Sequence, residues 1–173
     1  NRDAEGSIRV RLRSRFVHIN TVAEKYRELK AKFSEERWQD GEAGNEAAKK
    51  FFHAKTGAAL AEYKYGLSSD AVSAISYHTT GKENMTPFEK VIYFADYIEE
   101  NRTDDECVDV RNKYLSLASK YPSPVCLDMA LLYAFDKTIK ILIKGQRYIH
   151  LDTICGRNSL VISLGDMAEK VYM

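Results

Sequence analysis

Apolar residues recur at three- and four-residue steps through nearly the whole chain, a spacing typical of amphipathic helices rather than of strands. Only 9 glycines and 3 prolines occur among the 173 residues, so few of the tight turns that a β-sandwich or barrel needs are available. No internal repeat and no linker-like segment divides the chain. We therefore predict one all-α domain over residues 1–173, with about six or seven helices.

Local signals mark several helix ends. Thr86-Pro87-Phe88-Glu89 combines an N-cap threonine, a proline at the first helical position and a glutamate at the third, which together form a capping box. Gly66 follows a predicted helix over residues 45–65 and is a typical C-terminal stop. Further helices are predicted over residues 14–33, 69–78, 86–98, 110–120 and 125–144, with an acidic loop at 99–109 and one short helical pattern near 163–172.

Composition narrows the class of protein. The chain is 45% hydrophobic and 29% charged, which is enough to bury a core and stay folded. Its net charge of +1 gives no field that would attract nucleic acid or a membrane surface, and no apolar run reaches bilayer length. Three scattered cysteines, Cys107, Cys126 and Cys155, are typical of reduced thiols. We expect a cytoplasmic protein with neither a nucleic-acid nor a membrane partner.

Four chemically active side chains fall on apolar helix faces. His78 lies three residues after Ile75, and Asp96 lies four after Ile92, so we predict that both point inward. A buried carboxylate is unfavourable unless it is paired, hydrogen-bonded or bound to a metal. Each residue alone has a structural interpretation, as a core histidine or a capping aspartate. Together, on four separate predicted helices, they are typical of a site for Fe, Mn, Zn or Ni: His18, His53, His78 and Asp96.

The segment His78-Thr79-Thr80-Gly81-Lys82 has two interpretations. Its hydroxyls, amides and lysine suit phosphate oxygens beside the predicted metal site. Equally, a glycine in this position is typical of an ordinary helix C-cap. Both interpretations stay open at the level of the sequence.

Residues 74–85 (AISYHTTGKENM) and 89–102 (EKVIYFADYIEENR) closely resemble the YqeK family, a bacterial branch of the HD-domain metal-dependent phosphohydrolases. Residues 15–18 (RFVH) and 53–58 (HAKTGA) are similar to two further ligand segments of that family, and residues 134–143 and 149–158 are similar to its C-terminal part. The resemblance implies a helical HD-domain-like bundle. It also implies two bound metal ions, expected to be iron with manganese or zinc as substitutes.

What the resemblance implies for function is symmetrical hydrolysis of dinucleoside tetraphosphates, so that diadenosine tetraphosphate gives two ADP. Carried over by position, Asp96 and His18 would bind one metal, and His53 and His78 the other. Two metals activate a water and neutralise the polyphosphate, and Asp96 is the residue we expect to be catalytic. We predict that the phosphates contact Thr79, Thr80, Gly81, Arg102 and Lys55, with Lys82 as a further cation.

The sequence departs from the family at one important place. The family carries an adjacent His-Asp pair between its first and third ligands, and the aspartate bridges the two metals. No such pair occurs between His18 and His53, and Asp40 is the one nearby candidate. Either a segment is missing between about residues 33 and 45, or the protein has lost the pair.

These two explanations lead to different functions. An intact site predicts a hydrolase with a nucleotide substrate. A lost pair predicts a catalytically degenerate HD-like domain that binds nucleotides or another protein, and a purely structural role for the histidines predicts no metal. A second copy of the chain, as a homodimer, is a further partner to test.

Overall fold

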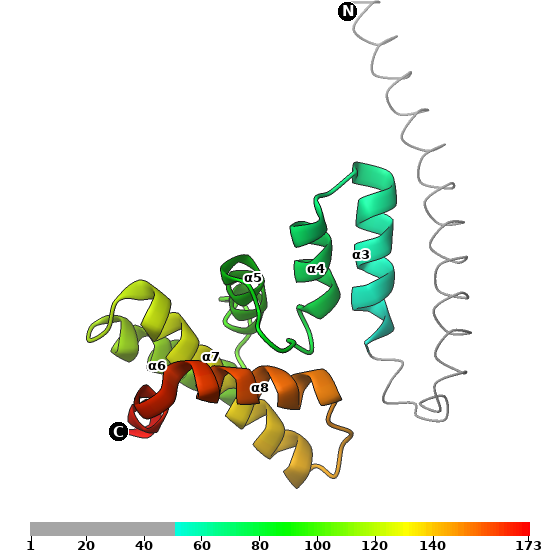
Figure 1. The fold of residues 1–173 in the computed structure, drawn as a ribbon. Coiled ribbons are helices and arrows are strands. Elements are labelled where there is room, and N and C mark those ends of the chain that lie inside the picture. The colour runs from blue at the N-terminus through cyan, green and yellow to red at the C-terminus, as the bar shows by residue number, and fades with distance from the viewer. Residues whose placement is uncertain (1–50) are drawn as a thin grey trace, which may run out of the picture.

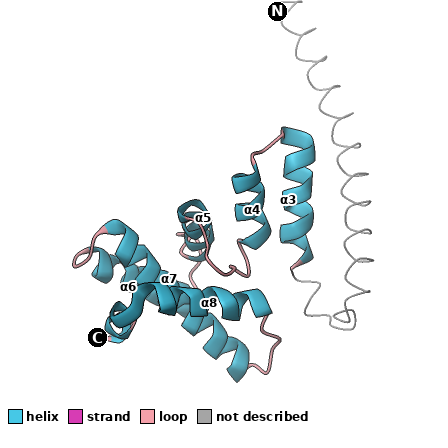
Figure 2. Ribbon diagram, in the orientation of Figure 1, coloured by secondary structure: helices cyan, strands magenta, loops and turns pink. Residues whose placement is uncertain are grey.

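The structure is a computed structural model that describes residues 51–173, and all regular elements in that part of the chain are helical (Figures 1 and 2). The all-α prediction is confirmed for these residues. The elements are α3 (Phe52–Tyr65), α4 (Ser69–Tyr77), α5 (Pro87–Tyr97), α6 (Asp105–Ala118), α7 (Ser123–Lys144), α8 (Leu151–Leu164) and the 3₁₀ turns η1 (Gly165–Met167) and η2 (Glu169–Tyr172).

Two predicted helix ends form as expected. The Thr86 hydroxyl accepts from the Glu89 amide at 3.3 Å, and the Glu89 carboxylate accepts from the Thr86 amide at 2.8 Å, which completes the capping box of α5. Gly66 ends α3 with a left-handed backbone at φ 60°. The first residues of the predicted helix at 45–65, the whole predicted helix at 14–33 and the interval at 33–45 lie outside the described residues.

Two helix predictions were wrong. The acidic loop is shorter than predicted, because α6 already begins at Asp105. Asp105 and Glu106 lie in the first turn of α6, where their negative charges complement the helix dipole. The tail contains a full helix, α8, that the sequence pattern missed. Its buried positions are Thr153, Gly156 and Leu160, so two of the three carry no apolar signal.

The long helix α7 is the centre of the hydrophobic core. It packs against α5, α6 and α8, and Figure 1 shows α8 lying across it. α3 and α4 form an adjacent pair that joins this core through α5. The fully buried residues of α7 include Met129, Leu131 and Phe135.

The buried face of α5 differs from the predicted one. Phe88 and Val91 are 47% and 49% exposed, whereas Tyr93 and Phe94 are buried. The reason is that α7 lies against the face that carries Tyr93, whose ring stacks on Phe135 at a centroid distance of 4.9 Å. The Asp96 side chain is 48% exposed, so the prediction that it points into the core was wrong.

The loop after α4 is fixed against α7 and α8. Gly81 has φ 66°, and a Cβ added there would lie 2.4 Å from Cζ of Phe135. A Cβ on Gly156 of α8 would lie 2.9 Å from the carbonyl oxygen of Lys82. The hydroxyl of Thr153 donates to the Thr80 carbonyl at 2.9 Å. These contacts place the end of α4 firmly beside the core.

A buried carboxylate also ties α4 to α5. Glu89 is 2% exposed, and its Oε1 accepts from Ser73 of α4 and pairs with Lys82 at 2.8 Å. Burial by itself would raise the pKa of Glu89. The hydrogen bonds from Lys82, Ser73 and the Thr86 amide outweigh that effect and hold the pKa below its ordinary value.

No helix among residues 51–173 combines the length and the apolar character that crossing a bilayer requires.

Candidate functional site

Most of the predicted site residues in the described range line one pocket. The pocket has a volume of about 410 Å³, within the usual range for small-molecule sites. Its walls come from the start of α3, the end of α4, the second half of α5 with the loop that follows it, and α7. The lining residues are His53, His78, Thr79, Tyr93, Asp96, Tyr97, Arg102 and Thr138.

Two imidazoles converge in this pocket. His53 lies in the first turn of α3 and His78 is the C-cap residue of α4, and their Nε2 atoms are 3.2 Å apart. The Thr79 hydroxyl lies 3.3 Å from Nε2 of His53 and 3.1 Å from Nε2 of His78. Because α3 and α4 pack side by side, residues 25 positions apart meet here.

The backbone of α4 sets the orientation of His78. Its Nδ1 lies 2.7 Å from the carbonyl oxygen of Ile75, which has no hydrogen to donate, so a neutral His78 carries its proton on Nδ1. Its Nε2 lone pair then faces the Thr79 hydroxyl and the His53 ring. Metal-binding histidines usually donate their second ring nitrogen to a carbonyl in this way.

The spacing of the two imidazole nitrogens matches both a hydrogen bond between the rings and a pair of ligands to one divalent metal ion. With metal–nitrogen distances of about 2.1 Å, two imidazoles on the same ion hold their nitrogens roughly 3 to 3.5 Å apart. The observed 3.2 Å falls in that range. Among residues 51–173, however, no cluster of three or more His, Cys, Asp or Glu side chains could hold a metal. Of the two further predicted ligands, Asp96 lines the same pocket and His18 lies outside the described residues, as does the candidate Asp40.

Asp96 and Arg102 supply the charged part of the pocket. Nη2 of Arg102 donates to Oδ2 of Asp96 at 3.0 Å, and both side chains are about half exposed. Such exposed pairs contribute at most about 1 kcal/mol to folding. The ion pair therefore contributes little to stability, and its main effect is to orient the Arg102 guanidinium in the pocket.

The loop that carries Arg102 is held by a second arginine. Nε of Arg111 donates to the carbonyl of Ile98 at 3.0 Å, and its Nη2 donates to the carbonyls of Glu99 at 2.6 Å and Arg102 at 3.1 Å. These three bonds connect α6 to the C-cap of α5 and to two carbonyls of the loop that follows it. Arg102 thus extends from a fixed backbone.

Three predicted phosphate-binding residues lie elsewhere. The buried Thr80 hydroxyl donates to the Gly81 carbonyl at 2.8 Å, and the Gly81 amide donates to the Tyr77 carbonyl at 2.8 Å. These bonds match the helix-cap interpretation rather than the phosphate interpretation. Nζ of Lys55 lies 3.5 Å over the Tyr77 ring, outside the pocket. Of the 79–81 segment, only Thr79 lines the pocket.

Three pocket residues were missed from the sequence. Tyr93 and Tyr97 are one turn apart on α5, and their aromatic character is as typical of a core stripe as of a site. Thr138 belongs to α7 and donates to the Tyr97 hydroxyl at 3.3 Å across 41 positions of sequence. No local pattern could have indicated that contact.

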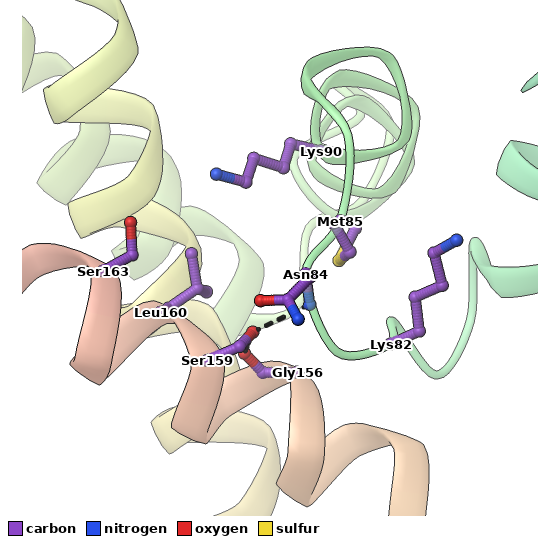
Figure 3. A pocket seen from close by; sticks show the side chains of 8 residues that line it. All are labelled: Lys82, Asn84, Met85, Lys90, Gly156, Ser159, Leu160 and Ser163. Carbon is purple, nitrogen blue, oxygen red and sulfur yellow. Dashed lines mark hydrogen bonds between the residues drawn. The ribbon is translucent and has the colours of Figure 1, made fainter.

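A second, smaller pocket of about 200 Å³ lies between the 82–90 segment and α8 (Figure 3). Both of its lysines already have carboxylate partners: Lys82 pairs with Glu89 and Lys90 with Asp128, each at 2.8 Å. The backbone amide of Asn84 donates to the Ser159 hydroxyl at 3.2 Å, and both residues line this pocket. This pocket contains none of the predicted metal ligands, and the histidine pocket is the candidate site.

Comparison with curated proteins finds enzymes of one name. The chain is 36% identical over 111 residues to the symmetrical bis(5'-nucleosyl)-tetraphosphatase of Bacillus subtilis. This match covers 64% of this chain and 55% of the relative. The chain is 35% identical over 103 residues to the enzyme of the same name from Staphylococcus aureus, covering 59% of this chain and 50% of that protein. The chain thus spans about half the length of the curated relatives it matches.

Comparison with family models finds no match. Comparison with solved structures finds a crystal structure from Clostridium acetobutylicum described as a predicted HD superfamily hydrolase involved in NAD metabolism. The two chains are 33% identical with a TM-score of 0.59, and the match covers 78% of this chain and 68% of that one. Sequence identity and fold agree over most of both molecules, and the chain belongs to the HD superfamily of hydrolases.

Proposed function

We propose that the chain is a metal-dependent phosphohydrolase that cleaves dinucleoside tetraphosphates symmetrically, so that diadenosine tetraphosphate gives two ADP. The observation that carries this proposal is the single pocket that contains the converging imidazoles of His53 and His78 together with Asp96 and Arg102. The names of the curated relatives support the choice of substrate.

The HD hydrolase fold implies a divalent metal, and His53 and His78 would supply its nitrogen ligands. When bound, such an ion acts as a Lewis acid on the phosphates and provides a nucleophile at neutral pH. We propose iron as the natural metal, with manganese or zinc as substitutes. Asp96 and His18 would serve a second ion.

The protein's own side chains would orient the phosphates and stabilise their charge. Phosphoryl transfer needs mainly orientation and charge stabilisation, because little covalent chemistry is required of the enzyme. The planar guanidinium of Arg102 presents several donors to phosphate oxygens, and Asp96 keeps it oriented in the pocket. The Thr79 hydroxyl lies beside both imidazoles, where it can donate to an oxygen of the reacting phosphate.

A second candidate function is a nucleotide-binding domain without catalysis. Two observations favour it: the sequence has no His-Asp pair between His18 and His53, and the structure shows no cluster of three metal-binding side chains among residues 51–173. Such a domain would bind a nucleotide through Arg102 and leave it intact.

Product analysis separates the two functions. The purified protein, supplied in turn with Fe²⁺, Mn²⁺ and Zn²⁺, is incubated with diadenosine tetraphosphate, and the nucleotides are separated by chromatography. We expect ADP as the only product, and none from a His53→Ala variant. ATP with AMP would contradict the symmetrical assignment. Intact substrate with every metal would favour the binding domain.

Location and assembly belong to the same proposal. All three cysteines are unpaired, and we place the protein in a reducing compartment, the cytoplasm. Gel filtration with light scattering would test whether the chain forms a homodimer.

A further inference from the structure

Tyr93 is the most buried polar residue of the candidate pocket. It is only 3% exposed, although it lines the pocket together with His78 and Asp96. Its ring stacks on Phe135 at a centroid distance of 4.9 Å and lies 6.4 Å from the ring of Tyr97 at a small interplanar angle. Contacts with both α5 and α7 therefore hold the ring in one position.

The hydroxyl of Tyr93 has no hydrogen-bond partner among residues 51–173. The other buried or half-buried tyrosines nearby are different: Tyr97 accepts from Thr138, and Tyr133 donates to Asp109 at 2.8 Å. Buried polar groups nearly always have a partner, since leaving one unpaired costs roughly 1 to 3 kcal/mol. A buried, unpaired hydroxyl in a pocket wall indicates that a bound molecule supplies the missing partner.

The hydroxyl is suited to donate rather than to ionise. Burial, together with the neighbouring Tyr97 and the charge of Asp96, raises the pKa of Tyr93, so its proton stays in place at neutral pH. The hydroxyl therefore has a proton to donate, and an acceptor in the pocket would pair with it. Arg102 and the Thr79 hydroxyl supply two further donors in the same pocket, and a set of donors of this kind suits an anion rich in oxygen.

We propose that the Tyr93 hydroxyl donates a hydrogen bond to a phosphate oxygen of the nucleotide that fills the candidate pocket. This inference rests on the proposed function for the identity of the nucleotide. Tyr93 is then a specificity residue for the phosphate chain, held in position by its stacked ring before the ligand arrives.

The substitution Tyr93→Phe tests this directly, because it removes the hydroxyl and keeps the stacked ring. The matched control is Tyr114→Phe on α6, whose ring packs on Phe94 at 5.1 Å and lies outside the pocket. Titration calorimetry with ADP and Mn²⁺ measures affinity, and thermal unfolding measures stability. A hydrogen bond to a charged group predicts about tenfold weaker ADP binding by Tyr93→Phe. Its melting temperature should be no lower than that of the wild type, and Tyr114→Phe should bind ADP normally.

The outcomes separate this inference from the proposed function. Equal ADP affinity in Tyr93→Phe and wild type would overturn the inference, even if the wild type cleaves diadenosine tetraphosphate. A clearly lower melting temperature in Tyr93→Phe would also overturn it, because the hydroxyl would then have an internal partner. A wild type that binds ADP without cleaving the tetraphosphate would defeat the proposed function alone. A wild type that does not bind ADP would defeat the inference as well.

Discussion

His78 and Thr79 owe their positions to the end of a helix. The last carbonyls of a helix lack intrahelical donors, and His78 satisfies one of them by donating from Nδ1 to Ile75. The same bond turns Nε2 of His78 toward His53 and Thr79. Helix termination and ligand orientation are thus one local arrangement of α4.

At the residue scale, Asp96→Ala should abolish hydrolysis of diadenosine tetraphosphate without unfolding the chain. Asp96 orients Arg102 and is a proposed metal ligand, whereas its half-exposed ion pair contributes at most about 1 kcal/mol to stability. ADP release and thermal unfolding would be measured together. The control is Asp105→Ala, an exposed acid in the first turn of α6. Near-normal turnover by Asp96→Ala would show that this carboxylate is dispensable.

At the element scale, the capping box of α5 does more than begin a helix. Glu89 accepts from the Thr86 amide within the cap and also binds Ser73 of α4 and Lys82 of the intervening loop. One buried carboxylate therefore joins two of the elements that line the candidate pocket.

We expect Glu89→Gln to lower the free energy of unfolding by about 2 kcal/mol or more, because it removes a buried charge and leaves Lys82 unpaired. Urea denaturation measures the loss. Glu83→Gln, an exposed acid in the same loop, should change stability by less than about 0.5 kcal/mol. Similar losses in both variants would mean that the contacts of Glu89 with Lys82 and Ser73 add no measurable stability.

The same residue predicts how stability depends on pH. The folded-state pKa of Glu89 lies below its ordinary value of 4.5, so the unfolded chain binds the proton more readily. Its contribution is present above pH 4.5 and is lost as the pH falls from there through the folded pKa. Urea midpoints measured on acidification should therefore fall more steeply in the wild type than in Glu89→Gln. Equal dependence of the urea midpoint on pH in the two proteins would contradict the lowered pKa of Glu89.

At the scale of the whole molecule, metal binding should stabilise the fold. His53 and His78 belong to different helices, so an ion held by both would favour the folded state over the unfolded chain. At a concentration 100-fold above its dissociation constant, Mn²⁺ should raise the melting temperature by roughly 5–10 °C relative to a chelator.

His78→Ala should remove this metal response. His150→Asn is the matched control, because His150 is the N-cap of α8, where its Nδ1 accepts from the Asp152 amide at 3.1 Å, and asparagine is also a good N-cap. That variant should keep the response to Mn²⁺. Identical melting curves for the wild type with Mn²⁺ and with chelator would contradict a metal site at these histidines.

What the sequence by itself determined is local. The capping box of α5 and the glycine that ends α3 act within a few residues, so pattern and residue type were enough to predict them. Histidine and aspartate on predicted apolar helix faces indicated His53, His78 and Asp96, the family resemblance indicated Arg102, and the structure places all four in one pocket.

Only the tertiary structure decided which faces are buried and which side chains meet. Asp96 shares a helical stripe with Phe88, yet both are about half exposed, because α7 packs on the neighbouring face of α5. Helix α8 buries a threonine and a glycine against the rest of the protein, a pattern that carries no apolar period. The contact of Tyr97 with Thr138 joins residues 41 positions apart. Each of these depends on where a distant helix lies, and short-range spacing contains no information about that.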